Sequence, residues 1–300
     1  MQDQNLSFRC GYAAIVGRPN VGKSTLMNRI LGQKISITSR KPQTTRHRIL
    51  GIHSTETCQA IYVDTPGLHS QGKKAMNRYL NQAATTALKD VDVVLFVVSG
   101  LKWTEEDETV LERLKHANAP VILVVNQIDR LQKEALLPHL QTLSALMKFH
   151  TIVPLSAKTG ENVEQLGQEV ERLLPIAPPF FPDDQITDRS MRFIAAEIVR
   201  EKLTRMLGQE LPYELTVEIE AYEAEENLVT IHALIWVARS GQKAIVIGKG
   251  GQGLKKVGQQ ARQDLERLLE QKVLLKLWVK VKEGWSADER ALRSLGYTED

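Results

Sequence analysis

The stretch GRPNVGKS, residues 17–24, decides the fold because it fits the pattern G-x-x-x-x-G-K-[ST]. An apolar run at Ala13–Val16 predicts a strand directly before it, and a helical stretch follows. In that position the backbone N–H groups of a glycine-rich loop and the positive end of the helix dipole point at phosphate oxygens. We therefore predict a phosphate site, with Lys23 at the β- and γ-phosphates and the Ser24 hydroxyl on Mg²⁺. The predicted contacts are Gly17, Arg18, Pro19, Asn20, Val21, Gly22, Lys23, Ser24 and Thr25.

The residues around this loop alternate between apolar runs of strand length and helical stretches. The predicted strands are Ala13–Val16, Ala60–Val63, Val91–Val98, Val121–Val125 and Ile152–Pro154. Such alternation predicts an α/β fold of the P-loop nucleoside triphosphatase class, with a mostly parallel sheet and helices on both faces. Ligands of these sheets bind beyond the carboxyl ends of the strands.

A second motif, DTPG at residues 64–67, follows the predicted strand Ala60–Val63. An aspartate at this strand end is placed to hold Mg²⁺ through water, and Gly67 offers a backbone N–H to a γ-phosphate. Alone, the tetrapeptide fits a simple turn equally well, and the phosphate loop upstream favours the nucleotide site. The predicted contacts are Asp64, Thr65, Pro66, Gly67 and Leu68.

The base is expected at NQID, residues 126–129, which follows the strand Val121–Val125. The Asp129 carboxylate can accept both N–H donors on the edge of guanine, whereas adenine has one amino group and no N1–H. A hydrogen-bond mismatch of this kind discriminates by orders of magnitude, so guanine is predicted. Asn126 would tie this loop to the phosphate loop, and Gln127 would pack on the base. A backbone N–H of Ser156, Ala157 or Lys158 would reach guanine O6.

In this order the segments resemble the G1, G3, G4 and G5 boxes of translation-factor-class GTPases, and the resemblance covers residues 11–175. The segment KPQTTR, residues 41–46, is similar to the G2 box, or switch I. The resemblance implies that Thr45 closes on Mg²⁺ in the triphosphate state, with Thr44 as the second choice. It implies Mg²⁺ ligation by Ser24, Thr45 and Asp64, and catalytic roles for Lys23, Asn20, Thr45 and Gly67.

Two positions depart from that pattern. Gln127 stands where lysine is usual, so we expect a modest loss of nucleotide affinity while Asp129 keeps the guanine selectivity. Leu68 stands where many small GTPases carry a glutamine that orients water, so slow intrinsic hydrolysis is expected. Relatives with this substitution use a monovalent cation held by an asparagine of the phosphate loop. Asn20 is at the matching position, which makes K⁺ stimulation a hypothesis here.

Length and composition allow two domains without disulfides. The chain has 300 residues, 42% hydrophobic and 25% charged, and its two cysteines are Cys10 and Cys58. The N-terminus, MQDQNLSFRCGY, lacks the basic and apolar regions of a signal peptide, so a cytoplasmic protein with reduced thiols is expected. The longest apolar runs, such as Val93–Val98, have the length of a strand and not of a membrane span.

The run PIAPPFFPDD, residues 175–184, marks a domain boundary because it holds four prolines in ten residues. Proline resists helix continuation and central strand pairing. We predict a nucleotide-binding domain over residues 1–178, a linker over 179–187 and a second domain over 188–300. The second domain is predicted to begin with a helix at Asp188–Leu207, capped by Asp188 and ended by Gly208.

The rest of the second domain is predicted as strands Tyr213–Tyr222 and Leu228–Val237, a short helix, the loop VIGKGGQGL at residues 246–254, a longer helix and a strand at Val273–Val281. Glycines in the loop would let two helix ends approach a sugar-phosphate backbone closely. A glycine turn between helices is the plainer alternative. The predicted RNA contacts are Gly248, Lys249, Gly250, Gly251, Lys255 and Lys256.

Charge is distributed unevenly. Residues 183–300 carry 18 Lys/Arg against 20 Asp/Glu, yet Arg239–Lys282 holds 11 basic and 3 acidic residues. That local patch would meet a polyanion. Lys272, Lys276 and Lys280 alternate along the last strand, where a solvated face is the favoured interpretation over specific contacts. Trp285 fits base stacking and core packing equally well.

The glycine loop resembles the V-I-G-x-x-G-x-x-L signature of a KH domain, and the order of elements is similar to the type II arrangement, a small α+β fold. A GTPase domain with PQTTR and DTPG joined to such a domain resembles the bacterial Era family over essentially the whole chain. That resemblance implies GTP and GDP as ligands, and the 3′ end of 16S rRNA and the 30S subunit as partners in assembly. It also implies a monomer with peripheral inner-membrane association.

Two other classes of function stay open. A GTPase that regulates another RNA, transport or a membrane-linked process would explain the N-terminal half equally well. An RNA-binding protein with a vestigial nucleotide site would explain the C-terminal half. The intact set of Lys23, Ser24, Asp64 and Asp129 argues against such decay.

Overall fold

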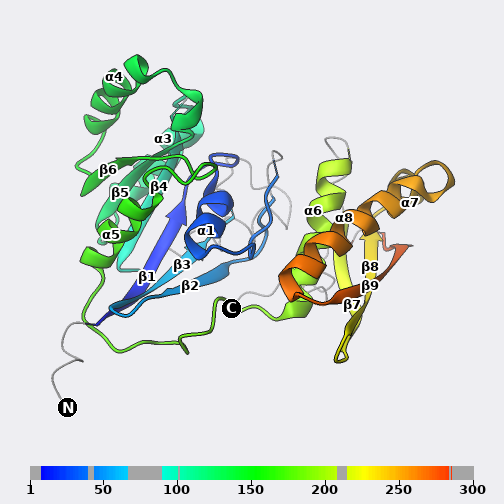
Figure 1. Cartoon of the computed structure of the whole chain (residues 1–300). Coiled ribbons are helices and arrows are strands. Elements are labelled where there is room, and N and C mark those ends of the chain that lie inside the picture. Colours follow the sequence, from blue (N-terminus) through cyan, green and yellow to red (C-terminus); the bar gives the residue numbers. More distant parts are fainter. Residues whose placement is uncertain are drawn as a thin grey trace, which may run out of the picture. The chain divides into compact units, whose positions relative to one another are not determined.

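The computed structural model describes residues 8–39, 44–66, 90–100, 102–207, 215–283 and 285. These residues form two compact units, and the last division between them falls after Asp188 (Figure 1). Within the ranges given, every helix is too short or too polar to cross a bilayer.

The first unit is built on a six-stranded sheet in the order β2-β3-β1-β4-β5-β6. Only β2 runs antiparallel to its neighbour, and the other pairs are parallel. The five predicted strands are confirmed, whereas β2 was not predicted because its sequence, ILGIHS, is short and interrupted by glycine. The strands are β1 Arg9–Val16, β2 Ile49–Ser54, β3 Cys58–Asp64, β4 Val93–Ser99, β5 Val121–Asn126 and β6 Thr151–Pro154.

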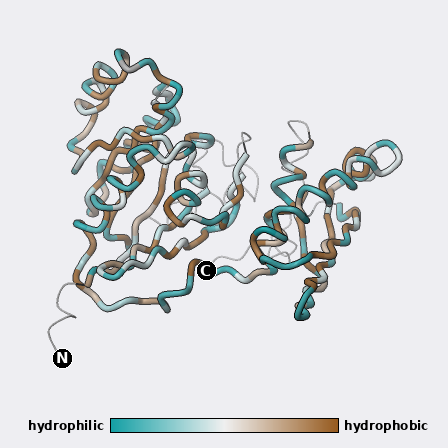
Figure 2. The backbone as a smooth tube through the Cα atoms, viewed as in Figure 1, coloured by the Kyte–Doolittle hydropathy of each residue, from teal (hydrophilic) through white to brown (hydrophobic). Residues whose placement is uncertain are grey.

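Helices cover both faces of this sheet. The described helices are α1 Lys23–Leu31, α3 Glu105–Leu114, α4 Lys133–Ser144 and α5 Val163–Leu173, with a 3-10 turn at Ile128–Arg130. Val110 and Leu114 of α3 pack with Phe96 and Val98 of β4 in one buried cluster. On the other face α1 and α5 contact each other and β3. Figure 2 shows the resulting layering, with apolar strands inside and hydrophilic outer helical turns.

The proline-rich segment is not a free tether in this fold. Ile52 donates its backbone N–H to the Ile186 carbonyl at 2.8 Å, and Leu50 donates to the Asp188 carboxylate at 3.1 Å. Phe181 packs on a small cluster of the sheet that includes Ile52. The residues predicted as a linker, 179–187, therefore belong to the first unit, because they cover apolar surface and satisfy edge N–H groups of β2.

The second unit contains a three-stranded sheet in the order β7-β8-β9, with β7 antiparallel and β9 parallel to β8. The predicted order of elements is confirmed. The elements are α6 Met191–Met206, β7 Leu215–Ala224, β8 Leu228–Val237, α7 Ser240–Ile247, a 3-10 turn at Lys249–Gly251, α8 Gln252–Leu269 and β9 Lys272–Val281. The division also groups the described residues of Ile37–Thr44 with this unit, where Thr38 donates its N–H to Glu201 at 2.9 Å.

The predicted start of the first helix of this unit was wrong. Ser190 and not Asp188 is the N-cap of α6, and its hydroxyl accepts the Phe193 N–H at 3.3 Å. The Asp188 carboxylate accepts the Leu50 N–H instead. The predicted stop, Gly208, lies outside the described residues.

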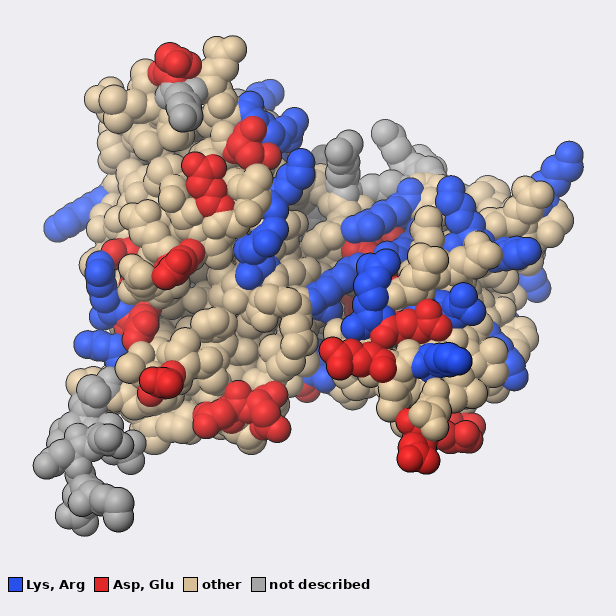
Figure 3. Space-filling model, viewed as in Figure 1, with Lys and Arg blue, Asp and Glu red and all other residues tan. Residues whose placement is uncertain are grey.

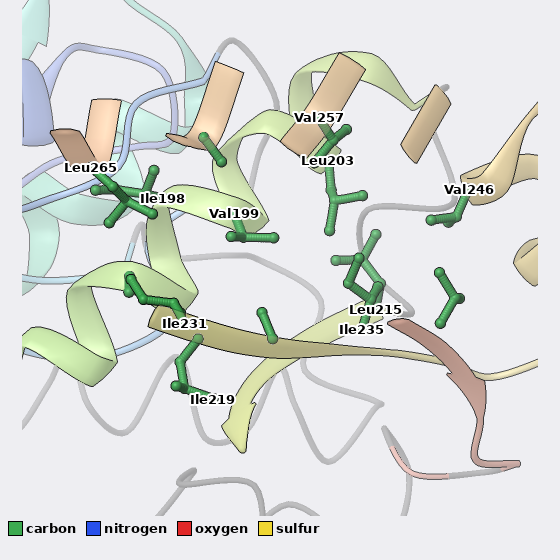
Figure 4. Close-up of a cluster of buried hydrophobic side chains, with 14 of the residues drawn as sticks. Ile198, Val199, Leu203, Leu215, Ile219, Ile231, Ile235, Val246, Val257 and Leu265 are labelled. Carbon is green, nitrogen blue, oxygen red and sulfur yellow. The ribbon is translucent and has the colours of Figure 1, made fainter. Parts of the chain in front are cut away.

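The core of the second unit lies between α6, α8 and one face of the sheet. Figure 4 shows Ile198 and Leu203 of α6, Leu265 of α8 and Ile231 and Ile235 of β8 gathered in this cluster. All five of these residues are at most 2 % exposed. Odd-numbered residues of β8 therefore face the helices, as the two-residue period of a strand requires.

Candidate nucleotide site and nucleic-acid interface

The predicted nucleotide motifs meet at one edge of the large sheet. The phosphate loop follows β1, Asp64 ends β3, Asn126 ends β5, and the loop holding Ser156 follows β6. These strands are parallel, so their carboxyl ends lie at the same edge. The strand order changes direction around β1, the usual position of a ligand crevice in such sheets.

The phosphate loop has a backbone that constrains its side chains. Gly22 has a φ of 99°, and a Cβ atom there would lie 2.3 Å from Nδ2 of Asn126. Asn20 also has a positive φ, 66°, which asparagine tolerates better than most residues. The loop then continues into α1, whose first residues are Lys23, Ser24 and Thr25.

Lys23 is folded back over the loop. Its Nζ donates to the carbonyls of Gly17 at 2.9 Å and Arg18 at 3.0 Å, and the residue is 7 % exposed. Burial lowers the pKa of its ammonium to about 8. A buried cation held mainly by neutral carbonyls is complementary to an anion. Lys23 is therefore placed to meet a phosphate group.

Three oxygen donors converge beside it. The Ser24 hydroxyl lies 2.9 Å from Thr45 Oγ1 and 2.9 Å from Asp64 Oδ2, and Thr45 Oγ1 lies 3.5 Å from the same carboxylate oxygen. Asp64 is fully buried, and burial raises the pKa of its carboxyl. Its Oδ1 has no hydrogen-bond partner among the described residues. Two hydroxyls and a carboxylate with an unsatisfied oxygen fit a hard cation such as Mg²⁺.

Asn126 joins the two ends of the site. Its Nδ2 donates to the Val21 carbonyl at 2.8 Å, and its Oδ1 accepts the N–H groups of Gln127 at 2.7 Å and Ala157 at 3.0 Å. One buried amide thus connects the phosphate loop with both loops predicted to surround the base.

The base-side carboxylate is held in position. Ser156, fully buried, donates its hydroxyl to Asp129 Oδ1 at 2.7 Å, while Asp129 itself is exposed. A carboxylate that is held in one orientation and is accessible to solvent can accept hydrogen bonds from N–H groups on the edge of a ligand. Lys158 is exposed beside it.

Gln127 adopts a φ of 70° and uses its amide within the protein. Its Oε1 accepts the Ser99 hydroxyl at 2.9 Å, and its Nε2 lies 3.5 Å from the Asn20 carbonyl. The side chain therefore lies along the phosphate loop.

Several site residues were missed by the sequence analysis. Arg29 of α1 donates to the carbonyls of Ala157, at 3.1 Å, and Lys158, and so holds the loop after β6. Ser36 donates to Asp64 Oδ2 at 2.7 Å. Asp107 of α3 pairs with Arg18 of the phosphate loop. These residues carry no local motif that identifies their distant partners.

Some predicted residues cannot be placed. Lys41, Pro42 and Gln43 of the switch I motif, together with Gly67 and Leu68, lie outside the described residues.

The glycine loop of the second unit connects α7 and α8. Gly248 has a φ of 73°, and a Cβ there would lie 3.0 Å from the Gly253 nitrogen, so the two helix ends approach closely. Gly250 and Gly251 also have positive φ angles. Lys249, Lys255 and Lys256 are exposed around the loop. Figure 3 shows Lys and Arg side chains gathered on the side of α7 and α8, with acidic ones at the β7–β8 turn.

Two protein families match the chain. Residues 12–127 match the family described as 50S ribosome-binding GTPase, and residues 210–286 match the KH domain.

Similar proteins extend over nearly the whole chain. GTPase Era of Pseudomonas aeruginosa (strain LESB58) is 60% identical over 290 residues, which are 96% of this chain and 95% of that protein. GTPase Era of Azotobacter vinelandii is 60% identical over 298 residues, 99% of each chain.

Solved structures agree with these matches. A point variant of Aquifex aeolicus Era bound to GDP·AlF4⁻ superposes with a TM-score of 0.93 at 39% identity, covering 97% of this chain and 100% of that one. Era in complex with MgGDPNP and nucleotides 1506–1542 of 16S ribosomal RNA gives the same TM-score, identity and coverage.

Proposed function

The chain belongs to the Era family of GTPases, and from that premise we propose that it is a GTP-hydrolysing switch that binds the 3′ end of 16S rRNA and acts in 30S subunit assembly. One observation carries the proposal most directly. Ser24, Thr45 and Asp64 converge beside the buried Lys23, while Asn126 ties that cluster to the loop of Asp129. This arrangement supports a phosphate site and a base site at one sheet edge.

On the phosphate side, residues Gly17–Thr25 would surround the β- and γ-phosphates with N–H groups, and Lys23 would neutralise their charge. Ser24, Thr45 and Asp64 would hold Mg²⁺, directly or through water. The ion would neutralise charge that develops on the phosphate oxygens. Thr65, Pro66, Gly67 and Leu68 would complete this side of the site.

On the base side, Asp129 would accept both N–H donors of guanine, and the Ser156 hydroxyl keeps its carboxylate oriented. The Ala157 N–H already donates to Asn126, and the Ser156 N–H donates to the Glu161 carbonyl at 3.1 Å, so Lys158 would supply the N–H to guanine O6. The Gln127 stem would pack on the base.

Hydrolysis would be slow because Leu68 cannot orient water. We propose that Asn20 helps to hold K⁺ and that Lys23, Thr45 and Gly67 stabilise the developing charge. GTPase rates should then be higher in K⁺ than in matched Na⁺ buffer. Equal rates, or a K⁺ effect that survives Asn20→Ala, would exclude this role.

The glycine loop would clamp about four nucleotides of single strand through Gly248, Gly250 and Gly251, with Lys249, Lys255 and Lys256 near the phosphates. A relative of known structure holds nucleotides 1506–1542 of 16S rRNA, which supports this RNA as the partner. GTP would favour the RNA-binding state, and binding reciprocity requires nucleotide and RNA to raise each other's affinity by one factor. Cytoplasmic localisation with peripheral inner-membrane association and a monomeric state complete the proposal.

Calorimetry on the full chain tests the nucleotide half. GTP and GDP should bind with Mg²⁺, and ATP at least about a hundredfold more weakly. Lys23→Ala should abolish hydrolysis while RNA binding to the glycine loop persists.

A complementary variant tests the RNA half. Gly250→Asp places a negative charge where a Cβ meets nothing within 4 Å, and aspartate is among the residues that tolerate a φ of 59°. It should therefore abolish RNA binding and leave GDP affinity unchanged. Failure of the wild type to bind guanine nucleotides, or equal affinity for ATP, would refute the proposed switch.

A further inference from the structure

The small sheet has a second face, opposite the described helices α6 and α8. Ile231, Ile235 and Val279 pack into the core with α6 and α8. Side chains alternate along a strand, so the even-numbered residues of β8 and β9 lie on the opposite face. Part of this surface is covered, because Leu234 is 1 % exposed. We define the tryptophan face by His232, Trp236, Lys276, Trp278, Lys280 and Lys282.

Two lysines lie over one indole ring. Trp236 is paired in register with Lys280, whose Nζ is 5.9 Å from the ring centroid, and Lys282 Nζ is 5.7 Å from the same centroid. Trp236 Nε1 donates to Glu218 at 2.8 Å, which fixes the ring. Lys280 also lies 3.5 Å from Glu220, so part of its charge is met by β7. Two ammonium groups therefore lie next to an aromatic ring. A nucleotide could place its phosphate near the ammonium groups and stack its base on the ring.

A second ring on this face is open to solvent. Trp278 is 42 % exposed, and its centroid is 5.2 Å from the His232 ring, which meets it edge-on at 70°. Lys276 precedes Trp278 by two residues, about 6.6 Å along the strand. A base stacked on Trp278 would therefore bring neighbouring phosphates close to Lys276 and Lys280.

The two edge strands of this sheet carry opposite charge. The charged residues at even positions of β9 are all basic, whereas Glu218 and Glu220 lie on β7 at the other edge. A polyanion would thus be drawn to the β9 side. β9 is an edge strand, and α7, which leads into the glycine loop, contacts it. A strand of RNA that leaves the loop can therefore reach this face around β9.

We propose that the tryptophan face is a second RNA-contact surface, which stacks unpaired bases on Trp278 and Trp236 and pairs their phosphates with Lys276, Lys280 and Lys282. The proposal rests on the proposed function of the glycine loop, because it extends the same RNA. An acidic protein segment is the other partner that this chemistry would fit, and RNA binding by variants of the face distinguishes the two partners.

The test measures fluorescence anisotropy of the GTP-bound full chain with two labelled probes. One is RNA of 16S nucleotides 1506–1542, and the other is a hexanucleotide from that RNA, chosen as the tightest binder to the glycine loop. Trp278→Ala should weaken binding of the long RNA about tenfold and leave the hexanucleotide unchanged. Trp278→Phe should restore most of the affinity. The double variant Lys276→Ala, Lys282→Ala should reduce the slope of log affinity for the long RNA against log salt concentration by about one to two.

Phe180→Ala, at a 50 % exposed aromatic of the first unit, is the matched control and should change neither affinity. The proposal is overturned if Trp278→Ala binds the long RNA like wild type, the result expected for an acidic protein partner. It is also overturned if both probes weaken equally and Trp278→Phe does not rescue them. In either case, loss of hexanucleotide binding in Gly250→Asp leaves the proposed function standing. A wild type that binds neither probe refutes both.

Discussion

Arg18 in the phosphate loop and Asp107 in α3 form a salt bridge in which Nε and Oδ2 are 2.9 Å apart. Asp107 is fully buried, and the same oxygen accepts the N–H and the hydroxyl of Thr104 at the start of α3, each at 2.9 Å. One carboxylate therefore caps a helix and anchors the phosphate loop. The loop position thus depends on a residue that belongs to no nucleotide motif.

Replacing this carboxylate should weaken both stability and ligand binding. We expect Asp107→Ala to lower the free energy of unfolding by about 3 kcal/mol, because it breaks the capping box with Thr104 and leaves the partly buried guanidinium of Arg18 without its charged partner. GDP affinity should fall several-fold as the loop loosens. Urea unfolding and calorimetry measure the two effects. Glu112→Ala, in the exposed pair with Lys115 on the same helix, is the control and should change neither. An unchanged GDP affinity in Asp107→Ala would show that the anchor does not shape the ligand site.

Gln127 offers a test of the unusual base-side residue. Lysine at this position would retain the stem and add a charge beside the phosphate loop, so Gln127→Lys should raise GDP affinity by about two- to fivefold. Gln127→Gly keeps the positive φ but removes the stem and the bond from Ser99, so it should weaken binding. Calorimetry with GDP compares the three proteins. If lysine gives no gain, the position is neutral for affinity.

Replacing glycine by alanine should have opposite effects at two positions of the first unit. Gly22→Ala should abolish nucleotide binding, because the new Cβ would lie 2.3 Å from Asn126 Nδ2 and φ is 99°. Gly167 lies within α5, and a Cβ there meets nothing within 4 Å. Gly167→Ala should therefore stabilise the protein by about 0.5–1 kcal/mol and leave GDP binding unchanged. Nucleotide binding retained in Gly22→Ala would contradict the close approach seen in the loop.

The buried thiol of Cys58 predicts a loss of stability at alkaline pH. Burial raises its pKa from 9.0 to about 12, because the thiolate loses its hydration. As the pH rises, the thiol ionises first in the unfolded chain. Its contribution to the free energy of unfolding is therefore complete below pH 9 and is lost progressively between pH 9 and about 12. Within that window the slope approaches about 1.4 kcal/mol per pH unit.

Comparison with Cys58→Ala isolates this effect. The variant should be less stable at about pH 8, because it removes buried volume, but its stability should fall less steeply from about pH 9 to 10.5. Urea unfolding at each pH measures both curves. Parallel curves would mean that Cys58 ionises alike in both states.

The local sequence pattern was sufficient to predict much of the fold and of the candidate site. The loop at residues 17–24, the motif that begins at Asp64 and the motif that begins at Asn126 each follow an apolar run. Strand ends in a parallel sheet share an edge, so these motifs had to meet. The order of elements around the glycine loop was likewise readable from periodicity and glycine placement.

What local pattern does not encode is which distant side chains become partners. Arg18 meets Asp107 across 89 positions, and Arg29 meets Ala157 across 128. The lysines of β9 fit a solvated face on sequence alone, and only the register places Lys280 opposite Trp236.

The sequence by itself determined the two domain types and the phosphate loop, and it predicted the chemistry of the base site, because these depend on short-range spacing and residue type. Only the tertiary structure decided the packing of residues 179–187, the Ser190 cap, the Asp107 anchor and the tryptophan face. Apart from the local Ser190 cap, each of those joins residues far apart in the sequence, which meet only when the whole core is buried.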